Sequence, residues 1–128
     1  MEFLKINNSS SRILGRDFNN KMSSLEYLLK RIMLIYKTEK VKNILLIDRA
    51  IELIESVNFP SWQEYKFTPT QNKILENFIS THKLLLNQSK QYLLLLKRDD
   101  SIEEKDNFRL MVAAQRAILN CRGLVVNF

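Results

Sequence analysis

Glycine and proline are scarce in this chain, since each occurs only twice among 128 residues. Sheet proteins need many tight turns built from these residues, so their scarcity favours long helices joined by few connections. Long apolar runs are also missing: the longest, residues 44–47 and 92–96, are far too short to span a bilayer. A secretory signal is not expected, because Glu2 and Lys5 interrupt the first apolar residues.

The chain has one cysteine, Cys121, and one histidine, His82. A single thiol makes no intramolecular disulfide and no cysteine metal cage, and His82 has no ligand companion four residues later. Glycine-rich phosphate loops, nucleophile elbows and His-Glu zinc motifs are absent from the sequence. We therefore expect no cofactor, no metal and no enzymatic activity, and we expect the protein to lie in the reducing cytoplasm.

Size and charge set the next limits. A chain of 128 residues is expected to form one domain, residues 1–128, with a core that needs no covalent staples. Its net charge of +6 is uneven, because residues 1–50 hold ten Lys and Arg against five acids. Such an excess can steer a protein toward nucleic acid, an anionic membrane or an acidic protein, without proving any of them.

The clearest helical signal lies between Thr68 and Arg98. The opening Thr68-Pro69-Thr70-Gln71 combines a hydroxyl cap, a proline at the first helical position and a glutamine three residues after the cap. A stripe then recurs at steps of three and four, which are the steps of one helix face. Its members are Leu75, Phe78, His82, Leu85, Ser89, Tyr92 and Leu96. The pattern predicts a helix over 69–98, longer than its neighbours, so part of its stripe is expected to stay uncovered.

Similar patterns predict three more helices, near 17–37, 40–57 and 102–122. Because no glycine or proline falls between residues 17 and 57, the first two can also merge into one long helix; we favour a break near 37–40. The resulting prediction is an all-α, up-and-down bundle of four main helices. Residues 1–16 and 124–128 are expected to form peripheral arms, and the second of these has a strand-like composition.

Three polar residues fall on otherwise apolar helix faces, namely His82, Ser89 and Gln115. If the last two helices fold back about residue 100, residue 85 lies opposite 115. Gln115 is then expected to reach His82 or Ser89 and to form a polar layer in the core. The main interpretation of this layer is that it sets helix register. The alternative is a bundle-core enzyme site at His82, which would require a sizeable enclosed pocket there.

Basic residues cluster around the end of the first predicted helix, and these are Lys30, Arg31, Lys37, Lys40 and Lys42. A solvated helix face is the simplest interpretation of this cluster. Contact with a phosphate backbone or an acidic protein is the alternative. Aromatic residues are not interleaved with the lysines, and no helix-turn-helix spacing is present, so base reading is not supported.

Two apolar regions are candidate partner surfaces. Residues 44–47 are apolar around most of a helical turn, which points to Leu45 and Leu46. The connection before Pro69 holds several aromatic residues, including Trp62 and Tyr65, which either plug one end of the bundle or meet a ligand or partner. We therefore expect a non-enzymatic protein-interaction module, as a homo-oligomer or an accessory subunit. The alternative function is sequence-nonspecific nucleic-acid binding through residues 30–42.

Overall fold

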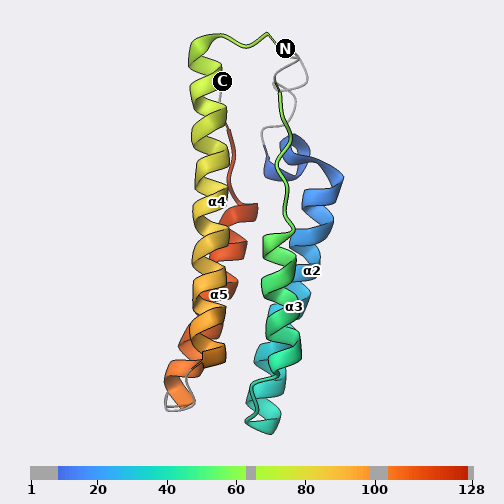
Figure 1. Cartoon of the computed structure of the whole chain (residues 1–128), viewed down its shortest axis with the longest axis vertical. Coiled ribbons are helices and arrows are strands. Elements are labelled where there is room, and N and C mark those ends of the chain that lie inside the picture. Colours follow the sequence, from blue (N-terminus) through green and yellow to red (C-terminus); the bar gives the residue numbers. More distant parts are fainter. Residues whose placement is uncertain (1–8, 63–65, 99–103, 127–128) are drawn as a thin grey trace.

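The computed structural model describes residues 9–62, 66–98 and 104–126. Over these residues the chain is an all-α bundle of four helices, as the sequence predicts. The helices are α2 (Ser10–Glu39), α3 (Ile44–Glu55), α4 (Pro69–Arg98) and α5 (Glu104–Arg122). They alternate in direction along the long axis of the molecule (Figure 1). No helix among the described residues has an apolar stretch of the length needed to cross a membrane.

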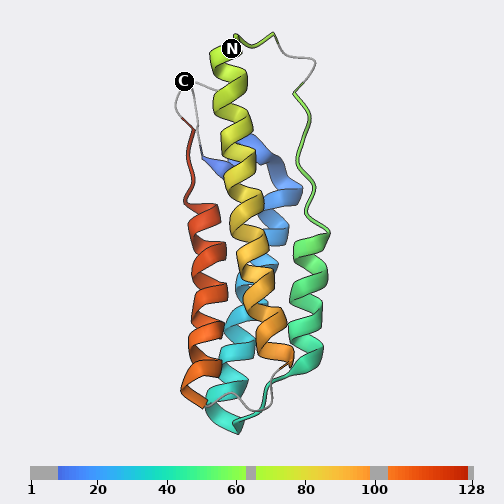
Figure 2. The ribbon, with the colours of Figure 1, turned by 60° about the vertical axis from the view of Figure 1, so that its left-hand side comes forward.

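Each helix packs against the two that flank it, in the order α2, α3, α4, α5 and back to α2. Figure 2 shows the helices side by side from a second direction. Every helix turns its apolar face inward, because that is the only arrangement that removes all four stripes from water. The fully buried large side chains include Met22, Leu25, Leu29, Ile32, Ile47, Leu93, Leu96, Met111 and Ile118.

The first helix begins earlier than the sequence predicts. It starts at Ser10 rather than near residue 17, and it passes through Gly15 as a kink. Gly15 has φ +93° and ψ 179°, a conformation that only glycine adopts readily. The glycine therefore interrupts the helix geometry without ending the helical segment. Two residues after Gly15, Asp17 forms an ion pair with Lys21 at 3.3 Å.

The break between the first two helices is confirmed, and the merged-helix alternative is wrong. Lys40 adopts the left-handed conformation with φ 57°, and its N–H donates to the Tyr36 carbonyl at 2.9 Å. This is the usual geometry of a helix C-terminus, where glycine is the common residue. Asn43 then caps α3, its side chain accepting from the Leu46 N–H at 3.1 Å. The second helix therefore starts at Ile44, four residues later than predicted.

The predicted start of α4 is confirmed by a reciprocal capping box. The Gln71 N–H donates to Thr68 Oγ1 at 3.1 Å, and the Thr68 N–H donates to Gln71 Oε1 at 3.0 Å. The last helix is described from Glu104 to Arg122, just before Gly123. Its predicted start at residue 102 lies outside the described residues.

The apolar stripe of α4 is covered along its length, so the expectation that part of it stays bare is wrong. Leu75 and Phe78, near its start, are only 4% and 6% exposed. Two segments outside the long helices cover the apolar stripe near the start of α4. Phe59 and Trp62 of the α3–α4 connection pack against the core, and Val126 of the C-terminal segment is 2% exposed. That segment docks on the bundle, where Val125 forms an antiparallel bridge with Ser9.

Candidate functional site

A buried polar cluster is built around His82, which is completely inaccessible to solvent. Its Nδ1–H donates to the Phe78 carbonyl one turn earlier at 2.7 Å, because a carbonyl can only accept. Its Nε2 lies 2.8 Å from the Ser10 hydroxyl, which comes from the first turn of α2. The rings of Phe18, Phe59 and Phe78 stand around the imidazole at centroid distances of 5.5, 6.2 and 4.4 Å.

Ser10 ties the C-terminal segment into the same cluster. Its hydroxyl oxygen lies 2.8 Å from the Leu124 carbonyl oxygen and 3.2 Å from that of Cys121. The Ser10 N–H also donates to the Leu124 carbonyl, at 3.2 Å. Burial lowers the pKa of His82 below its ordinary value, and the backbone carbonyls of Phe78 and Cys121 oppose this only in part. The neutral imidazole therefore joins α2, α4 and the C-terminal segment.

The polar layer predicted from sequence is only partly assembled. Ser89 is fully buried and donates to the Ala114 carbonyl at 2.9 Å, and Cys121 lies across from His82. Gln115 is half-buried and takes part in neither set of hydrogen bonds among the described residues. The register between α4 and α5 explains why Gln115 stays outside the layer. Residue 89 meets residue 114, whereas folding about residue 100 would place residue 89 beside residue 111. The helices are displaced by about one turn.

The side chains of Ser10 and His82 are both buried in the bundle. A hydroxyl beside an imidazole is the arrangement of a nucleophile and its base, but Ser10 is 1% exposed. The hollows of about 700, 640, 490 and 310 Å³ over the described residues are lined by residues other than Ser10 and His82. Burial raises the pKa of the Cys121 thiol to about 12, so it is not a thiolate at neutral pH. Within the described ranges, no three His, Cys, Asp or Glu residues gather to hold a metal ion.

The predicted basic cluster is divided by the structure. Lys42 is half-buried, and its Nζ donates to the Leu96 carbonyl at 2.9 Å, where it covers the C-terminal end of α4. The ammonium of Lys37 lies over the Phe108 ring at 5.1 Å from the centroid. Lys30, Arg31 and Lys40 are exposed. Of the five cations, Lys42 is thus half-buried in the bundle, and Lys37 is exposed but contacts an aromatic ring of α5.

Of the four candidate partner residues, Leu45, Leu46, Trp62 and Tyr65, the three described ones do not share one environment. Leu45 is 81% exposed, whereas Leu46 and Trp62 are half-buried and pack against the core. Tyr65 lies outside the described residues. The packing of Trp62 and Phe59 agrees with the interpretation of this connection as an aromatic plug.

Three neighbours of Leu45 were not singled out from the sequence. Leu34, Val41 and Ile44 are 55%, 54% and 39% exposed, and with Leu45 they lie in the last turns of α2, in the α2–α3 connection and in the first turn of α3. We call these four residues the turn patch. They account for four of the nine exposed large hydrophobic side chains among the described residues, within twelve positions of the chain. A sequence signal for Leu34 did exist, since it lies outside the stripe formed by Leu25, Leu29, Ile32 and Tyr36.

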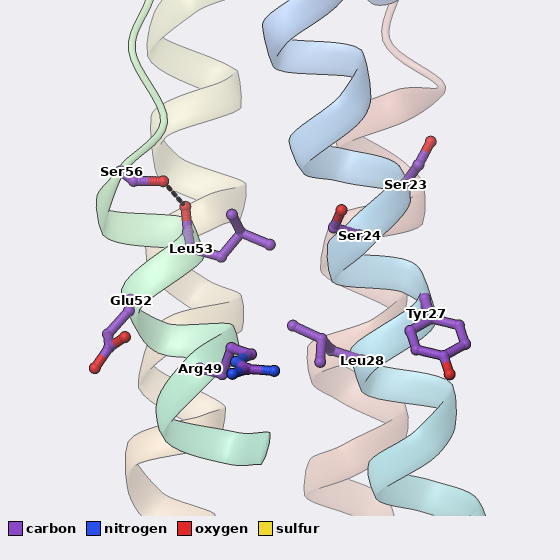
Figure 3. A pocket seen from close by; sticks show the side chains of 8 residues that line it. All are labelled: Ser23, Ser24, Tyr27, Leu28, Arg49, Glu52, Leu53 and Ser56. Atoms are coloured by element: carbon purple, nitrogen blue, oxygen red, sulfur yellow. Dashed lines mark hydrogen bonds between the residues drawn. The ribbon is translucent and has the colours of Figure 1, made fainter. Parts of the chain in front are cut away.

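A groove follows the seam between α2 and α3, beside the turn patch. It consists of two adjoining hollows of about 700 and 490 Å³, which share Arg49 and Glu52 of α3. In Figure 3, Leu28 and Leu53 point toward each other across the seam, and the Arg49 guanidinium extends toward α2. The carboxylate of Glu52 turns to the outer side of α3 (Figure 3). Arg31 of α2 lines the second hollow, near Leu45 and Leu46.

The comparisons give no relative from which a role could be taken: no protein-family model, curated protein or solved structure matches this chain.

Proposed function

We propose that this protein is a non-enzymatic interaction module that binds another protein through the turn patch. The observation that carries the proposal is the exposure of Leu45, at 81%, beside three further exposed apolar side chains. Apolar side chains that gather at one place on a small protein mark a binding surface more often than isolated ones do. Such a surface loses water-exposed apolar area when a partner covers it, and this supplies affinity.

The test compares the full chain with its Leu45→Ser variant. Covering one leucine is worth about 1.5–3 kcal/mol, so the variant should bind its partner about tenfold more weakly or worse. Each protein is used to capture partners from nuclease-treated lysate of the source cells, and its mass in solution is measured. The mass distinguishes a foreign partner from a second copy of the chain.

Leu84→Ser is the matched control, because Leu84 of α4 is 57% exposed but lies away from the turn patch. Neither substitution should alter the thermal unfolding curve, since both side chains already face water. Equal capture by the wild-type protein and Leu45→Ser would refute the proposal.

Sequence-nonspecific nucleic-acid binding is the second candidate function. The observation in its favour is the exposure of Lys30, Arg31 and Lys40 along one end of α2. A phosphate contact would release counterions, so binding to DNA or RNA should weaken steeply between 50 and 200 mM salt. No measurable binding at low salt would remove this candidate.

A further inference from the structure

We infer that the groove between α2 and α3 binds an amphipathic helix of the partner protein, with carboxylates of that helix paired to Arg31 and Arg49. This inference rests on the proposed function and names the chemistry of the partner. It follows from the shape of the groove, from its apolar floor and from two cations that have no counterpart within the described part of the chain.

The shape and the floor of the groove suit a helix. The hollows run from Leu45 of α3 to Ser56 just after it, a span of twelve residues or about 16 Å along the axis. That length accommodates about three turns of a partner helix. Leu28 and Leu53 supply apolar contacts at one end, and Leu45 and Leu46 supply them at the other. Leu45 also belongs to the turn patch, so the groove and the patch form one continuous surface.

The charge of the groove selects the sign of the partner. Arg31 and Arg49 are exposed, and neither guanidinium forms a hydrogen bond or an ion pair with another described residue. The acids nearby do not neutralise them. Asp48 and Glu52 also line the groove, but neither forms an ion pair with Arg31 or Arg49. Asp48 is held by Lys97 at 2.7 Å, and the Glu52 carboxylate points to the outer side of α3 in Figure 3. A guanidinium fork binds a carboxylate in a bidentate manner, which suits an acidic partner.

The positions of the two arginines predict a spacing in the partner. Lys21 donates to the Ser56 carbonyl, which fixes the antiparallel register of α2 and α3. In that register Arg31 lies level with Leu46, and Arg49 follows about 4.5 Å further along, close to one helical turn. The partner helix should therefore carry two acidic residues three or four positions apart, bordered by apolar residues about seven positions apart.

The test is a selection of displayed 18-residue peptides on the full chain, from a library randomised within a helix-forming frame. Recovered peptides should be enriched in the acidic and apolar spacing just described. A synthetic copy of the best peptide should lose at least tenfold in affinity when its acids are changed to Gln. It should lose as much when the protein carries Arg31→Glu with Arg49→Glu.

Arg116→Glu is the matched control, because Arg116 is an exposed arginine of α5, a helix that does not flank the groove. This variant should bind the peptide as the wild-type protein does. Circular dichroism establishes that each variant is folded, and all three arginines are on the surface. Selection on the double variant should in turn recover peptides with Lys or Arg in place of the acids.

Several outcomes would overturn the inference. These are the recovery of no peptide, the recovery of peptides without acidic preference, and unchanged binding to the double variant. Loss of self-association, or of binding to a 20-nucleotide DNA, on the double substitution would assign the groove to a second copy or to nucleic acid instead. The two proposals fail separately. If Leu45→Ser weakens partner capture but no acidic peptide is selected, the proposed function stands and this inference falls.

Discussion

Replacing Ser10 by alanine tests whether the buried cluster around His82 holds the two ends of the chain to the bundle. The Ser10 hydroxyl lies 2.8 Å from His82 Nε2 and 2.8 Å from the Leu124 carbonyl oxygen. Alanine removes this hydroxyl and leaves an imidazole nitrogen, at 0% exposure, with no partner. An orphaned buried polar group costs about 1–3 kcal/mol, and we expect the free energy of unfolding to fall by that amount.

Ser89→Ala provides the comparison, because both serines are buried and both lose one hydroxyl. The Ser89 hydroxyl donates to the Ala114 carbonyl, which lies inside α5 and retains its helical N–H donor. No group is orphaned there, so the cost should be only about 0.5–1.5 kcal/mol. The difference between the two variants isolates the orphaned imidazole from the loss of a hydroxyl as such.

The measurement is urea unfolding at pH 8, followed both by circular dichroism and by the fluorescence of Trp62. At this pH His82 is neutral in the folded and the unfolded chain, so the comparison contains no proton uptake. The single tryptophan reports on the connection that packs beside the cluster. If Ser10→Ala costs no more than Ser89→Ala, the cluster does not stabilise the fold in the way argued.

Three further predictions concern single positions. Because burial lowers the pKa of His82, the unfolded chain binds a proton more readily than the folded chain does. The contribution of His82 to the free energy of unfolding is therefore complete above about pH 6.5 and should fall as the pH drops below that value. In urea titrations between pH 5 and 7, a His82→Gln variant should lose this pH dependence. Gly15→Ala should lower the free energy of unfolding by about 1–3 kcal/mol. A Cβ at this position meets no atom within 4 Å, so the whole cost is the backbone strain at φ +93°. A loss as small as that caused by Gly123→Ala would contradict this reasoning. Cys121 is 0% exposed, and burial raises the pKa of its thiol to about 12. At pH 8 it should therefore react with a thiol reagent roughly 100-fold more slowly in the folded protein than in urea. Equal rates in the two conditions would disprove the burial argument.

The residues of the candidate site are harder to predict from the sequence than the fold is. Leu45 was predictable because residues 44–47 are apolar around a whole turn, and one helix face cannot bury all of them. Arg49 was not, because nothing in its local sequence says that it lacks an acidic partner. For the same reason the sequence places Lys37 and Lys42 in one basic cluster with Lys30, Arg31 and Lys40, although the fold brings Phe108 to Lys37 and the Leu96 carbonyl to Lys42.

What the sequence determined by itself is local. Helix periodicity and the Thr68–Gln71 capping box depend on residues within about four positions of one another, and such interactions are present whatever the rest of the chain does. Only the tertiary structure decided that Ser10 meets His82 across 72 positions, and that α4 and α5 are displaced by about one turn. An apolar stripe is nearly invariant to a shift of one turn, so periodicity cannot select the register. The packing of unequal side chains selects the register, and with it the pairs of residues that meet.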